Sequence, residues 1–208
     1  MVELDKHWEL VYETKKPTEV SWYQPHLRKS LELVSRTGIS KDAHVIDIGG
    51  GASTLVDDLL AQGFKHVTVL DIAAEALSVS KSRLGKSASQ VTWVEADIAR
   101  VVLPSHAFDV WHDRAVFHFL TNAEDRCKYV NAARHSLRPG GYLIIAAFSL
   151  NGPPRCSGLD VVRYSLQTMQ TEFGSEFELV ESLTEKHITP FNTKQEFVYC
   201  HFKLKSKR

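Results

Sequence analysis

Residues 45–55 read Val45-Ile46-Asp47-Ile48-Gly49-Gly50-Gly51-Ala52-Ser53-Thr54-Leu55. The apolar run Val45 to Ile48, interrupted by Asp47, predicts a buried strand, and the pattern from Leu55 predicts a helix that is closed by Gly63. A strand, a glycine turn and a helix N-terminus together direct backbone N–H groups at a ligand. This run therefore predicts a binding site for a polar group of a cofactor.

The glycine spacing and one carboxylate narrow the choice of cofactor. A dinucleotide fingerprint needs glycines two and five positions after Gly49, and only the first of these, Gly51, is present, because Thr54 takes the other place. Asp47 would also repel a pyrophosphate, whereas it suits a cofactor with a positive charge and with hydroxyl or amine donors. S-adenosylmethionine has these properties. The alternative is a glycine-rich turn that binds nothing.

Composition bounds the class of protein. The chain has 208 residues, 43% of them hydrophobic and 24% charged, and a formal net charge of zero. These values predict an ordinary globular protein with no global attraction to nucleic acid or to an anionic membrane. We expect a cytoplasmic protein, because there is no long apolar run and no signal-peptide core in Met1 to Lys6. The basic tail Lys203 to Arg208 is interpreted as a solvated terminus.

Two further aspartates follow predicted strands. His66 to Asp71 is a β-rich run, and an acid at the end of such a strand can accept hydrogen bonds from ribose hydroxyls. A helix cap is the alternative role for Asp71. Residues 90–98 predict the third strand and the turn after it, which carries Asp97. Asp47, Gly49, Gly51 and Asp71 are therefore candidate cofactor contacts.

The fourth predicted strand, Phe108 to His112, leads toward the expected reaction centre. Ligands in doubly wound sheets lie beyond the carboxyl ends of the strands. His112, Asp113 and His118 are therefore the candidate catalytic residues, and His112 is also a candidate cofactor contact. A buried histidine that only hydrogen-bonds to the backbone is the alternative for each histidine. Asp113 and Arg114 are adjacent and should point to different sides, so we do not expect a simple ion pair.

The remaining elements follow from periodicity and capping signals. Thr121-Asn122-Ala123-Glu124 predicts a capping box for a helix whose core side carries Cys127, Val130 and Leu137. Tyr142 to Phe148 predicts a fifth, fully apolar strand. A helix is predicted at residues 26–37, another at 73–84 and a further one at 159–173. Residues 177–187 and 195–205 predict a terminal hairpin.

The first 25 residues are rich in aromatic side chains, among them Trp8, Tyr12, Trp22 and Tyr23. They could cap one edge of the core. They could also form a lid over the cofactor, since flat rings cover a ligand at little entropic cost. On the second interpretation Trp22 contacts the cofactor and Tyr23 lies on the substrate side.

Several of these motifs together resemble one family. Asp47-x-Gly49-x-Gly51, Asp71, Asp97, Phe108-Asp109-Val110 and Leu137-Arg138-Pro139-Gly140-Gly141 are similar to motifs of the class I S-adenosylmethionine-dependent methyltransferases, over about residues 40–150. The resemblance implies an α/β fold, a Rossmann-like domain with a seven-stranded, mostly parallel sheet, an antiparallel final strand and helices on both faces. It also implies that Asp97 accepts a hydrogen bond from the adenine amino group and that Ile72 and Ile98 contact the cofactor. We expect a single domain over residues 1–208, with an N-terminal lid and helix segment (1–37), a cofactor-binding core (40–150) and a substrate-side region (151–208).

The methyl acceptor is less well indicated. Trp111-His112-Asp113-Arg114-Ala115, followed by Asp125-Arg126 and Tyr129, resembles the pattern in thiopurine, thiol and tellurite methyltransferases. His7-Trp8-x-x-x-Tyr12 with Ser21-Trp22-Tyr23 resembles the entry segment of small protein-lysine methyltransferases. Our leading hypothesis is methyl transfer to a small molecule, with a thiol or another soft nucleophile as the acceptor. Protein lysine methylation is the alternative within this class, and a non-catalytic S-adenosylmethionine-binding protein is the alternative of another class.

The loop after the fifth strand supplies the last candidates. Together with Tyr23 and Arg114, Arg155 and Cys156 are predicted to lie on the substrate side. The chain's three cysteines, Cys127, Cys156 and Cys200, are widely spaced and indicate neither a disulfide framework nor a metal site. No metal is therefore predicted, and no pattern indicates the oligomeric state.

Overall fold

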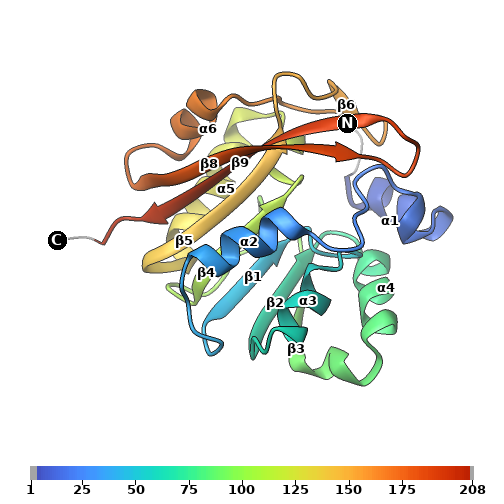
Figure 1. Ribbon diagram of the computed structural model, residues 1–208, viewed down its shortest axis with the longest axis horizontal. Coiled ribbons are helices and arrows are strands. Elements are labelled where there is room, and N and C mark those ends of the chain that lie inside the picture. The colour runs from blue at the N-terminus through green and yellow to red at the C-terminus, as the bar shows by residue number, and fades with distance from the viewer. Residues whose placement is uncertain (1–3, 207–208) are drawn as a thin grey trace.

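The computed structural model describes residues 4–206 and contains one seven-stranded sheet with helices on both faces (Figure 1). The strand order is β3-β2-β1-β4-β5-β9-β8. The seven strands are β1 (His44–Ile48), β2 (His66–Asp71), β3 (Val91–Glu95), β4 (Phe108–Arg114), β5 (Leu137–Phe148), β8 (Phe177–Ile188) and β9 (Lys194–Leu204). β1 to β5 pair in parallel, and β9 runs antiparallel between β5 and β8. The predicted fold class and terminal hairpin are confirmed.

Helices cover the two faces of the sheet in separate groups. The helices are α1 (Leu4–Thr14), α2 (Arg28–Arg36), α3 (Leu55–Ala61), α4 (Ala74–Leu84), α5 (Ala123–Ser136) and α6 (Leu166–Phe173). Short 3-10 turns occur at η1 (Pro17–Glu19), η2 (Gly85–Gln90) and η3 (Phe117–Phe119). One buried cluster joins α5 and α6 to the sheet, and a second joins α2, α3 and Leu77 of α4 to the opposite face.

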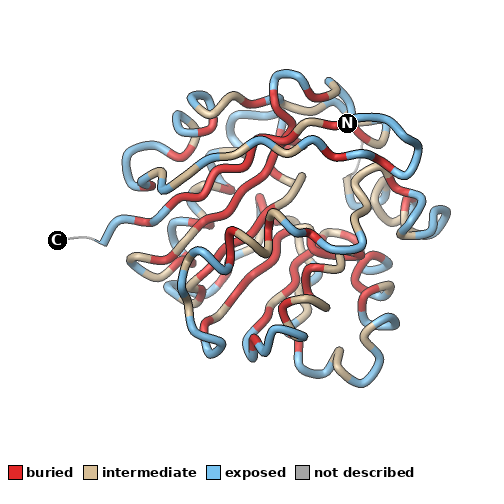
Figure 2. Tube along the Cα trace, in the orientation of Figure 1, coloured by how far each residue is buried: buried red, intermediate tan, exposed pale blue. Residues whose placement is uncertain are grey.

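Alternation along each strand explains both clusters. In β1, Ile46 and Ile48 face the α5 and α6 side, while Val45 faces the α2 and α3 side. Because successive side chains of a strand point to opposite faces, a parallel sheet covered on both sides needs a continuous apolar run. In Figure 2 the central strands are coloured as buried almost throughout, and exposed residues are concentrated in the outer turns and helices.

The fifth helix differs from the prediction at its start and on its buried face. Asn122, not Thr121, is the N-cap, and its side-chain oxygen accepts a hydrogen bond from the Glu124 N–H at 2.9 Å. The prediction that Cys127 lies on the core side of this helix was also wrong: the side chain is exposed, and Tyr129, Ala133 and Ser136 are buried instead. β5 then begins at Leu137, before the predicted strand start at Tyr142.

The predicted helix over residues 159–173 is also corrected. Only its second half is helical, because Ser165 caps α6 and its hydroxyl accepts a hydrogen bond from the Thr168 N–H. Its first two residues form β7 (Leu159–Asp160), which pairs with β6 (Arg155–Cys156) in a small hairpin, and residues 161–164 are not helical. The connecting Ser157 and Gly158 both have positive φ, as a tight two-residue hairpin turn requires.

The N-terminal segment contains a helix that periodicity did not reveal. In α1 only Val11 is buried, and the helix lies beside the N-terminal part of α4 at the edge of the molecule (Figure 1). The described region begins at Leu4 and ends at Ser206. Residues 1–3 of the segment Met1 to Lys6, and Lys207 and Arg208 of the basic tail, therefore lie outside the described residues.

Candidate active site

Two adjoining cavities open where the strand order reverses between β1 and β4. The larger, about 800 Å³ with its open mouth included, lies against the carboxyl ends of β1, β2 and β4, and the second, about 510 Å³, adjoins the glycine turn. Tyr12, Trp22, Ile48, Gly49 and Arg114 line both. Their place and size agree with ligand binding at a topological switch point.

The glycine turn is tightly packed, which explains its composition. Gly49 has a φ of +66°, and a Cβ there would lie 2.0 Å from a methyl carbon of Val116. Gly51 lines neither cavity, although it is a predicted cofactor residue. It packs beneath Asp71 instead: its N–H donates to Asp71 Oδ2 at 3.0 Å, and a Cβ would lie 2.4 Å from that oxygen. The turn and the end of β2 are therefore held as one unit.

The predicted ribose and adenine residues Asp71, Ile72, Asp97 and Ile98 all line the larger cavity. Asp71 is buried, and its second carboxylate oxygen accepts a hydrogen bond from the Ala73 N–H at 2.9 Å. Burial raises the pKa of Asp71 to about 6, while the backbone hydrogen bonds act in the opposite direction. Each carboxylate oxygen has two lone pairs, so this side chain can still accept hydrogen bonds from a ligand.

Asp47 and His112 form a buried chain with Ser30 beside the second cavity. His112 Nδ1 lies 2.6 Å from Asp47 Oδ1, and Nε2 lies 2.8 Å from the Ser30 hydroxyl. Both ring nitrogens are thus engaged, and His112 is 1% exposed. The other oxygen of Asp47 has no hydrogen-bond partner among residues 4–206. A buried carboxylate oxygen of this kind suits the ammonium group of an amino-acid cofactor.

Arg114, at the end of β4, is held at the boundary between the cavities. Nε donates to the Tyr199 hydroxyl at 3.1 Å, Nη1 donates to the Trp22 carbonyl at 3.0 Å, and the guanidinium lies 4.5 Å from the centre of the Phe197 ring. Nη2 forms an ion pair with Glu185 at 3.7 Å, which is too long for a hydrogen bond, and Nη2 has no hydrogen-bond partner within the described residues. The buried cation keeps unused donors. As expected, it makes no ion pair with Asp113.

Two of the three predicted catalytic side chains lie outside both cavities. Asp113 accepts hydrogen bonds from the Val116 N–H (2.9 Å), the Phe117 N–H (3.1 Å) and the Tyr129 hydroxyl (2.6 Å). It is buried, and burial raises its pKa to about 6. These contacts give Asp113 a framework role in shaping the segment after β4.

His118 is likewise enclosed. It accepts a hydrogen bond from the Phe148 N–H through Nδ1 at 3.2 Å, and its exposed fraction is 0%. Burial lowers the pKa of His118 to about 3, so the ring stays neutral at ordinary pH. The geometry of His118 therefore fits the alternative prediction, a buried histidine that hydrogen-bonds to the backbone.

Aromatic side chains from distant segments form one wall of the larger cavity. Trp8 of α1 makes edge contacts with Trp22 and Phe119, at centroid distances of 5.6 and 5.1 Å. Tyr12 also lines this cavity, and Tyr23 lines the second. The N-terminal rings were predicted from the sequence, but Phe119 of this wall was not. Glu185 and Tyr199, which contact Arg114, were not predicted either. Their pattern in sequence gives no sign that they meet, because they come from three separate elements.

The predicted substrate-side loop contributes one of its two residues. Cys156 lines the larger cavity, is buried, and has a pKa raised to about 11 by burial. Arg155 lines neither cavity and pairs with Asp160 on the surface at 3.0 Å. Among residues 4–206, no group of three or more histidine, cysteine or acidic side chains has a geometry that could hold a metal ion.

Comparisons with known proteins agree with this geometry. Residues 46–145 match the model of a methyltransferase domain family. EEF1A lysine methyltransferase 2 of Homo sapiens is 24% identical over 86% of this chain and 75% of its own length. A ubiquinone biosynthesis O-methyltransferase of Xylella fastidiosa is 28% identical, over 62% of this chain and 54% of its own. The chain thus spans about half the length of the second relative.

A solved structure extends the likeness to the whole fold. The 1,6-didemethyltoxoflavin-N1-methyltransferase of Burkholderia thailandensis, with bound S-adenosylhomocysteine, superposes with a TM-score of 0.69 at 18% identity, covering 99% of this chain and 85% of that one. Residues 46–145 thus match a methyltransferase domain, and the chain has the fold of the class I S-adenosylmethionine-dependent methyltransferases. S-adenosylmethionine is its cofactor, and the free oxygen of Asp47 and the Asp71 carboxylate fit the donors of that molecule.

No helix within residues 4–206 combines the length and apolar character needed to cross a membrane.

Proposed function

We propose that the chain transfers the methyl group of S-adenosylmethionine to a small-molecule acceptor with a soft nucleophile, such as a thiol that reacts as its thiolate. The bound cofactor supplies an activated methyl group, so the chain's residues mainly orient the two reactants. Near-attack positioning of this kind can lower a barrier by roughly 7–11 kcal/mol. Asp47, Asp71 and Asp97 would hold the cofactor, and the aromatic wall around Trp8 would receive the acceptor.

The observation that carries this proposal is the set of polar groups left at the boundary between the cavities. His118 and Asp113 line neither cavity, and both ring nitrogens of His112 already form hydrogen bonds, with Asp47 and Ser30. Arg114 contributes a cation with unused donors. A thiol that ionises in water needs no base from the protein, and a nearby guanidinium favours its anion.

An amine acceptor would meet a less suitable environment. It is protonated near neutral pH and must lose a proton before it can attack. Among residues 4–206, the cavity linings offer no histidine with a free nitrogen, and the carboxylates Asp71 and Asp97 accept hydrogen bonds from backbone N–H groups. Arg114 would also repel an ammonium group. The electrostatics therefore support a soft, anionic nucleophile.

One observation favours a second candidate, protein lysine methylation. A relative that carries this activity in its name aligns over 86% of the chain. On this hypothesis the lysine side chain would enter the larger cavity between the rings of Trp8 and Phe119. A flat aromatic surface attracts an ammonium group, although the site must still remove a proton before methyl transfer.

An acceptor panel separates these functions. The protein is incubated with methyl-labelled S-adenosylmethionine and, in parallel, with alkyl and aryl thiols, small amines, or proteins from a cell lysate. Methylated thiols are the expected product, and Asp71→Ala, which lacks the proposed ribose contact, should lose transfer to every acceptor. Label on a protein band without thiol product would support the lysine candidate. Cofactor binding without transfer in any arm would contradict both and favour a binding protein.

A further inference from the structure

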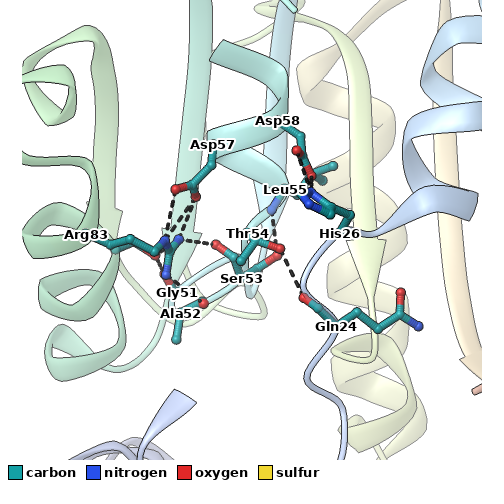
Figure 3. Close-up of polar contacts among 11 residues, drawn as sticks. Gln24, His26, Gly51, Ala52, Ser53, Thr54, Leu55, Asp57, Asp58 and Arg83 are labelled. Atoms are coloured by element: carbon teal, nitrogen blue, oxygen red, sulfur yellow. Dashed lines mark hydrogen bonds and ion pairs between the residues drawn. The ribbon is translucent and has the colours of Figure 1, made fainter. Parts of the chain in front are cut away.

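Arg83, in the last turn of α4, reaches back to the glycine turn on the opposite side from the second cavity. Figure 3 shows its guanidinium among the turn's carbonyl groups and Asp57. Nη1 donates to the Ala52 carbonyl at 3.1 Å, and Nη2 donates to the Ser53 carbonyl at 2.6 Å. Arg83 thereby links two consecutive peptide groups of the cofactor turn to a helix that follows the next strand.

Ser80 extends this contact by one residue. Its hydroxyl donates to the Gly51 carbonyl and accepts a hydrogen bond from Arg83 Nη2 at 2.9 Å. The carbonyls of Gly51, Ala52 and Ser53 therefore all bind side chains of α4. We name Arg83 and Ser80 together the carbonyl clamp.

The clamp has a consequence for the other side of the turn. In a planar trans peptide, the C=O of one residue and the N–H of the next point in opposite directions, and none of the described peptide bonds is cis. Holding the Gly51 and Ser53 carbonyls toward α4 therefore turns the N–H groups of Ala52 and Thr54 away from α4. Ala52 and Thr54 line the second cavity.

Arginine is suited to this position because its donors form a rigid fork. Asp57 accepts from Nε at 3.0 Å and from Nη2 at 2.7 Å, which fixes the guanidinium plane. A lysine would retain the charge but would provide no second, fixed donor direction. The ion pair is only partly exposed, with side-chain exposures of 29% for Arg83 and 31% for Asp57.

We infer that the carbonyl clamp is a positioning device for cofactor binding: it directs the N–H groups of Ala52 and Thr54 at the carboxylate of the cofactor's amino-acid portion. Arg83 acts through the backbone and does not itself contact the ligand. The inference rests on the cofactor and not on the proposed acceptor, so it is tested without any acceptor present.

Two ligands that differ by the amino-acid portion test the inference. S-adenosylhomocysteine carries that portion, and 5′-methylthioadenosine lacks it while it keeps the adenine and ribose. Arg83→Gln should weaken S-adenosylhomocysteine binding about tenfold or more in calorimetric titration, and should leave the affinity for 5′-methylthioadenosine within about twofold. Arg83→Lys should not restore the lost affinity, because it lacks the fork.

Arg134→Gln is the matched control. Arg134 forms a half-exposed ion pair with Glu176 between α5 and the start of β8 and should change neither affinity. If Arg83→Gln fails to fold, as judged by its melting temperature, Ser80→Ala is the second variant. It removes the Gly51 contact and the Arg83–Ser80 hydrogen bond but keeps the contacts of Arg83 to Ala52, Ser53 and Asp57, and it should weaken S-adenosylhomocysteine binding selectively by a few fold. Equal losses of affinity for the two ligands would overturn the inference. Arg83 would then stabilise the part of the site that binds adenine and ribose, which both ligands carry. Unchanged affinity for both would overturn it as well.

Discussion

The cofactor half and the acceptor half of the site are built in different ways. On the cofactor side, Asp47, Gly49 and Asp71 come from two paired parallel strands and their turns, and backbone hydrogen bonds such as Gly51 N–H to Asp71 fix their places. On the acceptor side, Trp8 and Trp22 come from the N-terminal segment, and the Trp8 ring contacts the rings of Trp22 and Phe119. The Arg114 side chain of β4 then joins the Trp22 carbonyl to the Tyr199 hydroxyl of β9.

This difference indicates which half of the site can accept substitutions without loss of the fold. The cofactor half is part of the sheet, so its geometry follows from strand register and from the glycine turn. The acceptor half is assembled from segments that cover the carboxyl edge of that sheet. We therefore expect cofactor binding to depend on a few backbone-anchored groups, and acceptor choice to depend on replaceable side chains.

The largest effect is expected from Asp71→Ala. The substitution removes the carboxylate that we assign to the ribose hydroxyls, and each charge-assisted hydrogen bond of this kind contributes roughly 1.5–3 kcal/mol. Affinity for S-adenosylhomocysteine should fall about a hundredfold in calorimetric titration. Asp71→Asn, which retains one oxygen acceptor, should lose less. Normal affinity in a folded Asp71→Ala protein would mean that the ribose assignment is wrong.

Arg114→Met should affect the other half selectively. Because the guanidinium is proposed to stabilise an anionic nucleophile, kcat/KM for a thiol acceptor should fall by about tenfold to a hundredfold. Affinity for S-adenosylhomocysteine should stay within about threefold of the parent. Arg114→Lys keeps the charge, so its kcat/KM for the thiol should lie between those of the parent and of Arg114→Met. Parallel losses of cofactor affinity and turnover would show that the two halves are not separable in this way.

A smaller effect is expected at the contact between α1 and α4. The Glu9 carboxylate accepts hydrogen bonds from the Ala74 N–H (2.6 Å) and the Glu75 N–H (3.1 Å), and so caps a helix that has no side-chain cap of its own. A charged cap at a helix N-terminus contributes about 0.3–1 kcal/mol. Glu9→Gln should therefore raise amide exchange in α1 several fold, measured by mass spectrometry.

The same experiment tests whether the N-terminal segment is a lid. S-adenosylhomocysteine should slow amide exchange in α1 and around Trp22, since Trp8, Tyr12 and Trp22 line the cavities. Equal exchange with and without ligand would identify the segment as fixed core packing, and the lid would be rejected.

The smallest effect on turnover is expected from His118→Gln, which should alter the rate less than threefold. Its influence should instead appear in the pH dependence of stability. The folded-state pKa near 3 lies below the usual 6.5, so only the unfolded chain takes up this proton between those values. The contribution of His118 to the free energy of unfolding is present above pH 6.5 and is lost as the pH falls toward 3.

The carboxyl groups of Asp71 and Asp113 change the free energy of unfolding in the opposite direction between about pH 4 and 6. The raised pKa values of Asp71 and Asp113, each about 6, favour the folded state at about pH 4 and lose that contribution as the pH rises through 6. The histidine term is isolated by comparing urea unfolding of the parent and His118→Gln at several pH values. The parent should lose stability more steeply than the variant below pH 6.5. Identical slopes would contradict a buried, neutral His118.

The sequence allowed the cofactor half and the sheet to be predicted, because the relevant information is local. A strand, its turn and the acid at its end are contiguous, as in Val45 to Gly51 and His66 to Asp71. The acceptor half could not be assembled in this way. Trp8 meets Phe119, and Arg114 meets Tyr199, only after the chain has folded. The position of His118 near the end of β4 suggested catalysis, but the 3-10 turn that contains it directs the ring inward.

The pH dependence of methyl transfer to two thiols of different acidity tests the proposed chemistry most directly. If the acceptor ionises without help from the protein, kcat/KM should rise tenfold per pH unit and level off near the pKa of each thiol. The midpoint should therefore move when the thiol is changed, and His118→Gln should leave both midpoints in place. One midpoint shared by both thiols would instead report a titrating group of the protein, and would contradict the proposal that the site uses no base.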